Sequence, residues 1–549
     1  MILNSSDIKN NQILNADICL IGSGPAILTL LEHLNIKKLK IILIPGGKFH
    51  YDKKNQKLYK GILAKNVNHE PLINNRHREF GGSGNYWGGR CVPFDEIDFK
   101  KRKWIKHSGW PLKLRDLSSY YNKASRYLKI SKYNKDTNFY IKGLNPMIKN
   151  LDDKKLTSKK LESWSPVLNF KKKLKKKIFS ENIILINNSH LIKIDANDKK
   201  VNNILCKVQD KKFNVLSKKY VLGCGGIENP RILLYSKNNY HPRGLGNAAN
   251  LVGRFYMAHH SGISLNLNPK DRKNIFYNYF KDSKGGAYLR NRLWFRENFQ
   301  KKNKVGNSIF FLNYTLNSKD MGAQGKLFEM LILYKKIISN KKNLCNFNII
   351  SKLISGLCNI HNLKYFIKFI FFRLKKNRLP SLLPGELSKY FGLYYQIEHT
   401  PCYYSRLTLD KKKDAFGVNM IKLNLKFNKV DLKTIFKTHS YLMDKMNTLK
   451  IVDFQKNYTS DKLLRMLKKK IKKFNSNAHH IGTTRMSFLK KYGVVDKNLK
   501  VFGINNLFIV GSSTFPTSSH ANPTYTIVAL SIKLSDYLNK FFMKKNKKN

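Results

Sequence analysis

Residues 16–34 read ADICLIGSGPAILTLLEHL, and this stretch decides the fold. An apolar run ends at Gly22 and is followed by a second apolar segment, which predicts a β-strand, a tight turn and an α-helix. The strand-like residues 40–44 (KIILI) complete a β-α-β unit, which is typical of a parallel sheet covered by helices. Gly22 and Gly24 match a dinucleotide-binding fingerprint, in which one glycine forms the turn and the next lets a pyrophosphate approach the backbone.

Two parts of that fingerprint are missing. Ile27 occupies the position of the third glycine, and we expect it to separate the helix from the strand or to alter their crossing. Ile44 stands where an acidic residue normally binds a ribose, and Asp52 is the nearest acid downstream. A lost hydrogen bond to a charged acceptor costs about 1.5–3 kcal/mol, so the missing acid weakens the expected affinity for a dinucleotide without excluding one.

Further segments repeat the order of strand, glycine and helix. They are KKYVLGCGG at 218–226 with NPRILLYS at 229–236, and NLFIVGSS at 506–513 with NPTYTIVALSIKLSDYL at 522–538. Asn522 is suited to cap the last helix and Pro523 to its first turn. Strands at the start, middle and end of the chain predict a discontinuous nucleotide domain, with a second domain built from the stretches between.

The chain is strongly basic, with 104 Lys and Arg against 34 Asp and Glu and a net charge of +70. Such a surplus suits nucleic acid or an anionic membrane. The basic runs are scattered, however, so we favour a lysine-rich solvated surface and predict no nucleic-acid partner. Residues 320–390 contain apolar-basic segments, which we interpret as core helices with lysine exteriors. Attachment to an anionic membrane, or a lid over a lipophilic substrate, is the less favoured alternative.

The seven cysteines are dispersed without a Cys-x-x-Cys pair, which argues against zinc, an iron–sulfur cluster or a disulfide framework. We therefore predict no metal. The first fifteen residues show no basic start followed by an apolar run, and no apolar stretch reaches a membrane-spanning length. These features predict a cytoplasmic protein, and the length of 549 residues predicts more than one domain.

Several spaced motifs together resemble the glucose–methanol–choline (GMC) family of flavin oxidoreductases. They are IGSGPA at 21–26, GGSGNYWGGRCVPFDEIDF at 81–99, SGWPLKLRDLSSYYNKA at 108–124, YVLGCGGIENPRILLYS at 220–236, GLGNAANLVGRFYMAH at 244–259, AHHIGTTRM at 478–486 and IVGSSTFPTSSHANPTYTIVAL at 509–530. The resemblance implies an α/β fold (α+β overall), with a discontinuous Rossmann-like FAD-binding domain and an antiparallel-sheet substrate domain. We expect the FAD-binding domain at 1–105, 181–260 and 476–549, and the substrate domain at 106–180 and 261–475.

The resemblance also implies catalytic residues. His479 matches the catalytic histidine of the family, and Asn522 matches its partner near the start of the last helix. A neutral imidazole can take the hydroxyl proton of an alcohol, whereas an amide can only orient the oxygen. His480 is expected to lie behind the site, and His520 to lie outside it.

The implied FAD contacts come from four parts of the chain. They are Gly22, Gly24, Pro25 and Ala26; Gly81, Gly82, Asn85 and Tyr86; Leu191; and Gly511, Pro523 and Thr524. The free N–H groups and the dipole of the last helix would stabilise negative charge on the flavin. In sugar-oxidising relatives with a covalent flavin, a histidine stands at the position of Tyr86. We therefore predict FAD bound without a covalent link.

The implied function is FAD-dependent oxidation of an alcohol, with a sugar or polyol as the expected substrate and an unknown electron acceptor. The hydroxyl proton would pass to His479, while the carbon-bound hydrogen would leave as hydride. Two alternatives stay open. One is a family member that keeps the flavin but performs lyase-like chemistry or no redox turnover. The other is a basic protein without catalysis that binds an anionic partner.

Overall fold

The computed structural model describes most of the chain. The described residues are 1–37, 39–139, 144, 146–166, 169–170, 175–269, 279–281, 287–314, 391–450, 452–454, 461–462, 465–467 and 478–546. The segment 320–390, for which the sequence favours core helices, lies outside these ranges.

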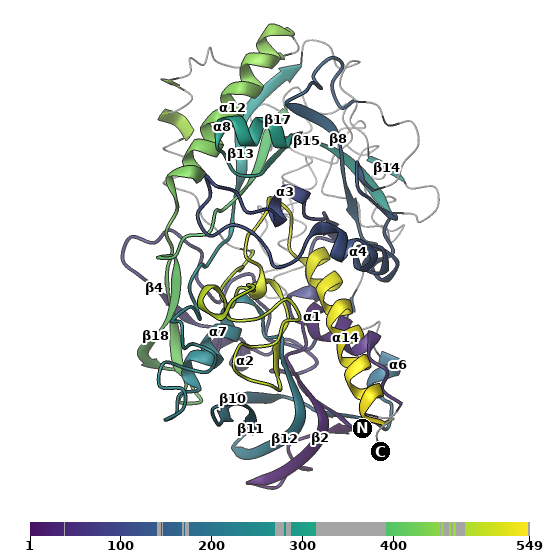
Figure 1. Cartoon of the computed structure of the whole chain (residues 1–549), viewed down its shortest axis with the longest axis vertical. Coiled ribbons are helices and arrows are strands. Elements are labelled where there is room, and N and C mark those ends of the chain that lie inside the picture. The colour runs from purple at the N-terminus through teal and green to yellow at the C-terminus, as the bar shows by residue number, and fades with distance from the viewer. Residues whose placement is uncertain are drawn as a thin grey trace, which may run out of the picture.

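An eight-stranded sheet forms the base of the molecule in Figure 1, with the order β1-β9-β3-β2-β12-β11-β10 and with β21 paired to β12. The strands are β1 (Ile2–Leu3), β2 (Gln12–Ile21), β3 (Ile41–Ile44), β9 (Ile183–Ile186), β10 (Ser189–Ala196), β11 (Val201–Val208), β12 (Lys211–Leu222) and β21 (Leu507–Ile509). β1, β9, β3, β2, β12 and β21 run parallel, whereas β11 and β10 extend the sheet in antiparallel fashion. β3 is buried along its whole length, as expected of a parallel strand covered on both faces.

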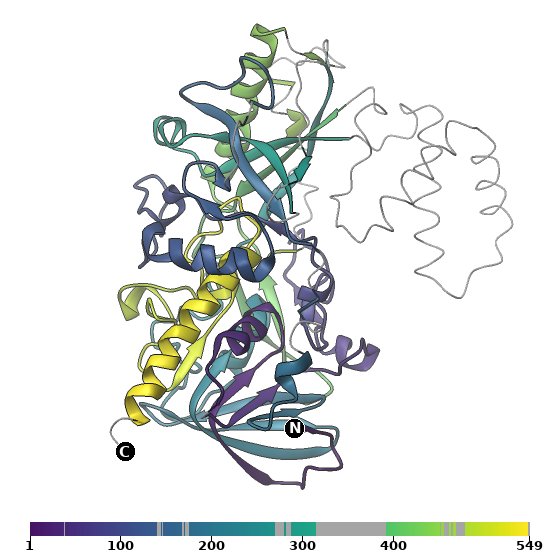
Figure 2. The ribbon, with the colours of Figure 1, turned by 90° about the vertical axis from the view of Figure 1, so that its right-hand side faces the viewer.

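Helices lie around this sheet and between it and the other end of the molecule. They include α1 (Pro25–His33), α2 (Lys53–Lys57), α3 (Glu96–Phe99), α4 (Leu114–Leu128), α6 (Lys175–Ile178), α7 (Gly225–Tyr235) and the long α14 (Thr524–Asn546). Figure 2 shows α14 alongside α4 and α1, against both of which it packs. Because β2, β12 and β21 are parallel neighbours, the loops that follow them meet at one edge of the sheet.

A second, antiparallel sheet lies at the other end of the molecule, with the order β20-β13-β17-β16-β15-β8-β5 and β14 on β15. Its strands are β5 (Arg90–Cys91), β8 (Leu156–Trp164), β13 (His259–Pro269), β14 (Tyr279–Lys281), β15 (Tyr288–Phe295), β16 (Ser308–Tyr314), β17 (Phe391–Glu398) and β20 (Val452–Phe454). The helices α8 (Glu297–Asn303) and α12 (Lys429–Thr448) lie at this end. A small sheet pairs β18 (Arg406–Lys413) and β19 (Asn419–Asn424) with β4 (Gly61–Leu63), and β6 (Tyr133–Asn134) pairs with β7 (Asn138–Phe139).

The predicted fold class is confirmed, because the parallel sheet is assembled from the start, the middle and the end of the chain. The predicted cap of the last helix is wrong. The Pro523 carbonyl accepts the hydrogen bond from Ile527 N (2.9 Å), so Pro523 holds the cap position and Asn522 precedes it. Among the helices of the described ranges, none combines the length and the apolar character that crossing a membrane requires.

Candidate active site

A cavity of about 460 Å³ lies at the carboxyl edge of the parallel strands. The loops after β2, β12 and β21 contribute Gly22, Gly223 and Gly511 to its wall, and the start of α14 contributes Thr524. The cavity therefore lies where open α/β sheets bind their ligands. All the predicted site residues line it except Gly81 and Asn85.

Two glycine-rich segments meet in this wall. Gly81 N donates a hydrogen bond to Ser23 O (2.9 Å), and a Cβ on Gly82 would lie 3.4 Å from Gly24 Cα. Gly22 has φ +102°, and a Cβ there would lie 2.7 Å from Gly223 O, so no larger residue fits the turn. Bare backbone and the N-terminus of α1 thus face the cavity together, which is an arrangement that fits a pyrophosphate.

Ile27 does not separate α1 from the sheet as the sequence led us to expect. The residue is fully buried, and a Cβ on Gly223 would lie 2.4 Å from Ile27 Cγ1. The glycine that allows close packing here therefore belongs to the end of β12 and faces Ile27 from across the contact. Gly223, about two hundred positions away in the sequence, thus provides the space that the third glycine of the fingerprint would otherwise provide.

Ile44, at the position of the ribose-binding acid, lines the cavity with an apolar side chain. Asp52 is not part of the wall; it accepts hydrogen bonds from Asn55 N (2.9 Å) and Lys48 (3.3 Å) and caps α2. These contacts and the lowered pKa of Asp52, caused first by the Asn55 N–H, mark it as a helix cap.

Charged side chains instead line that end of the cavity. Glu228 lies 3.1 Å from Arg76 and 3.3 Å from Arg231, which also reaches Asp414 at 2.6 Å. Arg78 NH1 lies 3.7 Å from Glu228 and its NH2 lies 3.3 Å from His190 Nδ1, while its buried Nε has no hydrogen-bond partner within the described structure. Arg76, Arg78 and Arg231 line the wall together with Glu79, Glu228 and Asp414, and the guanidinium group of Arg78 fits an anionic or oxygen-rich nucleotide.

Asn85 and Tyr86, two neighbouring residues predicted to contact the flavin, differ in their relation to the cavity. Asn85 folds back, and its Nδ2 donates to Glu79 Oε1 (3.0 Å) and to Phe80 O (2.8 Å), so its side chain does not line the cavity. Tyr86 does line it, with its ring stacked on His77 at 3.9 Å between centroids. His77 also lines the cavity, and the sequence analysis did not identify it.

The position of Leu191 supports its predicted role. It lines the cavity from β10, at a point where the pairing of β10 with β11 shifts register between Leu191 and Lys193. Such a bulge leaves backbone groups unpaired, so they are available to a ligand.

His479 is positioned by a second histidine, His259 at the start of β13. Their Nδ1 atoms are 2.7 Å apart, and His259 Nε2 lies 3.0 Å from Ser519 O and 3.2 Å from Ser518 O. Carbonyl oxygens only accept, so His259 Nε2 carries a proton and its Nδ1 accepts from His479 Nδ1–H. The Nε2 of His479 is therefore left with a free lone pair, and no described residue hydrogen-bonds to it.

The amide of Asn522 is oriented by a similar chain. Glu162 Oε2 holds Arg90 Nε (2.6 Å), and Arg90 NH1 donates to Gln396 Oε1 (3.0 Å). Gln396 Nε2 then donates to Asn522 Oδ1 (3.0 Å). Because a guanidinium can only donate, the orientation of both amides is fixed, and Asn522 Nδ2 remains as a donor. A proton acceptor and a hydrogen-bond donor thus face one cavity.

The same surroundings keep His479 uncharged. Burial, followed by the charge of Arg90, lowers the pKa of His479 to about 4. Burial, followed by the charge of His479, holds the pKa of His259 well below its usual value. Both rings are therefore neutral at physiological pH, as the direction of their hydrogen bonds requires.

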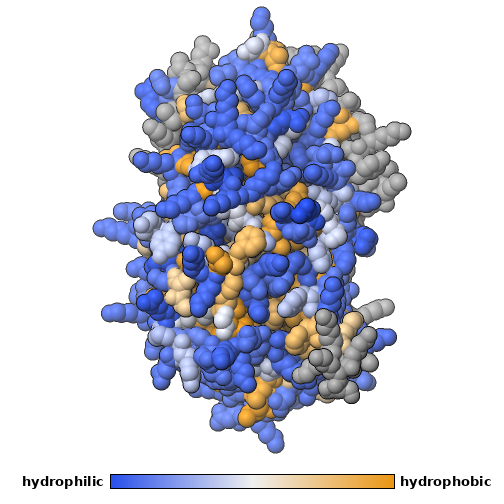
Figure 3. All heavy atoms as spheres, in the orientation of Figure 1, coloured by the Kyte–Doolittle hydropathy of each residue, from blue (hydrophilic) through white to orange (hydrophobic). Residues whose placement is uncertain are grey.

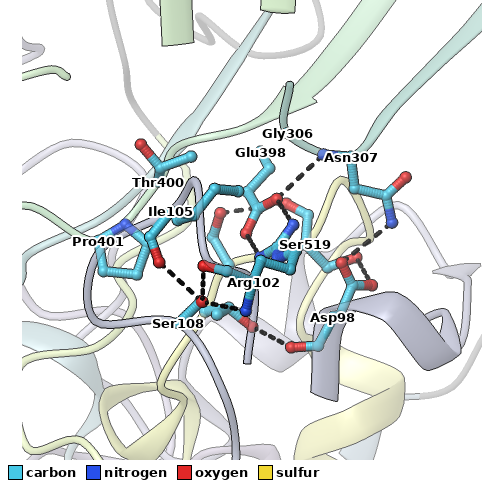
Figure 4. A network of polar contacts seen from close by, with 12 residues as sticks. Asp98, Arg102, Ile105, Ser108, Gly306, Asn307, Glu398, Thr400, Pro401 and Ser519 are labelled. Atoms are coloured by element: carbon cyan, nitrogen blue, oxygen red, sulfur yellow. Dashed lines mark hydrogen bonds and ion pairs between the residues drawn. The ribbon is translucent and has the colours of Figure 1, made fainter. Parts of the chain in front are cut away.

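A buried polar network supports the backbone that holds His259 (Figure 4). Ser519 has a left-handed φ of 54°, and its Oγ donates to Asp98 Oδ2 at 2.6 Å. Asn307 Nδ2 donates to Asp98 Oδ1 at 3.0 Å. Behind them, both terminal nitrogens of Arg102 bind the carboxylate of Glu398, at 2.6 and 2.5 Å. The network ties the 518–520 segment to α3 and to β17.

The two remaining histidines of the motifs lie near the predicted places. His480 is nearly buried and its Nδ1 meets Tyr256 OH at 2.7 Å, behind His479, although it also contributes to the cavity wall. His520 is fully buried against Asp95 Oδ2 (2.8 Å) and is not part of the wall. Within the described residues, no group of three or more metal-ligating side chains occurs.

Comparisons with known proteins agree with this architecture. Residues 403–531 match the family model described as GMC oxidoreductase. The fructose dehydrogenase large subunit of Gluconobacter japonicus is 22% identical over 323 residues, which cover 59% of this chain and 47% of that protein. A dehydrogenase of Armillaria gallica is 41% identical over 64 residues, or 12% of this chain and 10% of that protein. The matched part of the chain thus spans about half the length of the Gluconobacter protein and a tenth of the Armillaria protein.

Solved structures share the fold over nearly the whole chain. Pyridoxine 4-oxidase from Mesorbium loti has a TM-score of 0.54 and 14% identity, and covers 95% of this chain and 99% of its own. A variant of formate oxidase from Aspergillus oryzae has a TM-score of 0.56 and 15% identity, covering 98% and 100%. Residues 403–531 are thus similar to the GMC oxidoreductases in sequence, and nearly the whole chain shares the fold of these oxidases.

Proposed function

We propose that the protein is an FAD-dependent oxidoreductase that oxidises an alcohol, with a sugar or polyol as the substrate. The observation that carries this proposal is the pairing of a free His479 Nε2 lone pair with the Asn522 Nδ2 donor in one cavity. That pair is complementary to a hydroxyl group, which donates its proton to the one and accepts a hydrogen bond from the other.

The chain's own residues account for the proton in this reaction. His479 Nε2 takes the hydroxyl proton, and Asn522 Nδ2 stabilises the oxygen that becomes negative. His259 keeps the accepting lone pair on the correct nitrogen, and Gln396 keeps the donor turned to the cavity. FAD, when bound, supplies the acceptor for the hydrogen and the electron pair that leave the carbon.

The wall of the cavity offers places for each part of FAD. The contact of Gly24 with Gly82 and the N-terminus of α1 suit the pyrophosphate, while Arg78 and the bulge at Leu191 suit the adenosine end. The N-terminal N–H groups of α14, beginning at Thr524, suit the flavin ring. The name of the Gluconobacter relative, fructose dehydrogenase, supports a sugar as the substrate.

The test is anaerobic titration of the purified, flavin-loaded protein with a panel of sugars, polyols and simple alcohols. We expect one of these classes to bleach the flavin absorbance band. His479→Ala should slow that reduction about a hundredfold or more, because general-base catalysis contributes factors of this order, while flavin content stays unchanged. A fully reduced wild type with an unaffected His479→Ala rate would contradict the proposed role. Protein that takes up no flavin would contradict the whole proposal.

We further propose that the flavin is held without a covalent bond, since a tyrosine occupies position 86. Precipitation with trichloroacetic acid should therefore release the flavin into the supernatant. Flavin that stays with the pellet would contradict this, and the peptide containing His77, whose ring stacks on Tyr86, would be the one to analyse. A cytoplasmic location also remains a proposal, which cell fractionation tests.

A further inference from the structure

One exposed loop concentrates apolar side chains on the surface. Phe488, Leu489 and Tyr492 are 73%, 53% and 57% exposed, and Lys490 and Lys491 between them are also exposed. Most other exposed large hydrophobic residues of the described structure are isolated, apart from those near the end of α14. Three in five consecutive residues form a small apolar patch with two cations at its centre, here called the 488–492 loop.

The loop is held out from the molecule by its stem. Ser487 N donates to Val495 O (2.9 Å) and Val494 N to Arg485 O (2.8 Å), which closes the loop at its base. A Cβ on Gly493 would lie 2.5 Å from Ser487 Cβ, so the stem is packed tightly. The two ends of the loop are thus fixed to each other, and its apolar side chains are exposed.

The segments that border the loop are rich in basic residues. Arg485 NH2 donates to His107 O at 2.6 Å, which joins the stem to the segment 100–107. That segment exposes Lys101, Lys103 and Lys106. Neither 478–495 nor 99–107 contains an Asp or a Glu. An apolar tip is thus bordered by exposed positive charge.

Another aromatic residue extends this surface. Tyr404 is 70% exposed, and its ring lies 5.5 Å from that of Tyr403, which in turn lies 6.4 Å from His107. Figure 3 shows hydrophobic side chains gathered near the middle of one face and bordered by hydrophilic ones, where Figure 1 draws loops of the C-terminal segment.

We propose that the 488–492 loop binds the surface of a membrane containing anionic phospholipids. Phe488 and Leu489 would enter the boundary between headgroups and acyl chains, and Tyr492 would lie at the headgroup level, where aromatic residues are enriched. Lys490 and Lys491 would meet headgroup phosphates while their alkyl stems lie along the apolar region. Lys101, Lys103 and Lys106 would add long-range attraction. This surface lies outside the residues that line the cavity, so the proposal is independent of the proposed activity.

A membrane fits this surface better than a protein partner. The cores of protein interfaces are depleted of lysine, whereas two lysines stand at the centre of this patch. A lipid interface places apolar and phosphate groups within the reach of one short loop, so it satisfies both kinds of side chain together. The occupant we expect is therefore a lipid surface.

The test is cosedimentation of the flavin-loaded protein with vesicles of phosphatidylcholine alone and with vesicles that also contain phosphatidylglycerol. We expect binding to the anionic vesicles, with weak binding to neutral ones. The double variant Phe488→Ser and Leu489→Ser, and separately Lys490→Glu and Lys491→Glu, should each lower the affinity about tenfold or more. The matched control is Lys411→Glu and Lys412→Glu, an exposed lysine pair on β18, which should bind like the wild type.

Two further readouts make the result decisive. With Phe488→Trp, acyl-chain-brominated lipids should quench more fluorescence than in the wild type, since the new ring enters the bilayer. The proposal would be overturned if the Lys490/Lys491 and Lys411/Lys412 variants lost affinity equally and the serine variant lost none. Binding would then depend on net charge alone. No vesicle binding, together with self-association in analytical ultracentrifugation that the serine variant abolishes, would assign the loop to a second copy of this chain. Tm and flavin content verify that each variant is folded.

Discussion

At the scale of single residues, His259 decides which nitrogen of His479 is basic. His259→Ala removes the acceptor for His479 Nδ1–H. The imidazole of His479 can then carry its proton on Nε2 instead of Nδ1, or the ring can rotate. We expect kcat/KM to fall on the order of a hundredfold, as for other residues that orient a catalytic imidazole. Flavin content and Tm of the variant are the control measurements. His259→Gln, whose amide can accept from His479 and donate to Ser519 O, should recover part of the rate. Equal loss in both variants would point to a packing role only.

The same residues show how far a sequence leads toward a site. His479 was predictable because a motif surrounds it, and the resemblance segment 244–259 even ended at His259 without revealing its role. Gln396 lies in no motif that the sequence analysis identified. Its role depends on β17 lying beside both Arg90 and Asn522, which only the folded chain establishes. Asn85 shows the converse: its motif is present, but its Nδ2 donates to Glu79 and Phe80, which the motif does not reveal.

At the scale of elements, α1 packs against the end of β12 because the large side chain of Ile27 lies against Gly223, which has none. Gly223→Ala places a methyl group 2.4 Å from Ile27 Cγ1 and should destabilise the protein by about 1–3 kcal/mol through overpacking. Ile27→Ala leaves a cavity and should cost about 2–5 kcal/mol. The double variant should lose less than the sum of the two, and urea unfolding of all four proteins measures the coupling. Additive losses would show that the two residues do not compensate each other.

That contact also marks the limit of prediction at this scale. The β-α-β unit, the strand at 218–222 and the helix of residues 522–538 were recognisable because apolar periodicity and glycine signals are local. The effect of Ile27 was misjudged because the compensating glycine lies on another strand. The cap of α14 was misassigned for a related reason: Asn522 has a good capping side chain, but its oxygen is used by Gln396 from the second sheet. The local capping preference of Asn522 is not realised, because Gln396 occupies the side-chain oxygen that capping would use.

At the scale of the whole molecule, the two sheets meet around residues that belong to both. His479 and Asn522 belong to the C-terminal segment that carries β21 of the parallel sheet, while His259 and Gln396 belong to β13 and β17 of the antiparallel sheet. The proton acceptor and the donor are therefore oriented only when the two sheets are docked. Neither sheet alone would carry the arrangement that supports the proposed reaction.

That dependence on docking predicts acid sensitivity. His190, His259, His260, His399 and His520 are buried, and burial lowers the pKa of each on folding. The unfolded chain takes up these protons around pH 6.5 while the folded chain does not, so stability is complete from about one unit above that pH and is lost as the pH falls toward the folded values. Each proton contributes about 1.4 kcal/mol per pH unit. Asp98 and Asp431, whose pKa values burial raises to about 8 and about 7, act in the opposite sense but are fewer.

We therefore expect urea unfolding to show falling stability from pH 7.5 to 5.5, by several kcal/mol per pH unit. His399 offers a matched control, because its Nδ1 accepts from Ala258 N (3.1 Å) and its Nε2 donates to Lys426 O (2.9 Å), a pair of roles that a glutamine amide can imitate. His399→Gln removes one titrating group and should make the pH dependence shallower by one proton's contribution. Stability that stays constant or rises over this range would show that histidines do not govern the acid limit. The cause of acid unfolding would then lie in the buried carboxylates. Their pKa values are lowered by neighbouring arginines, as the pKa of Glu162 is by Arg290 and Arg90.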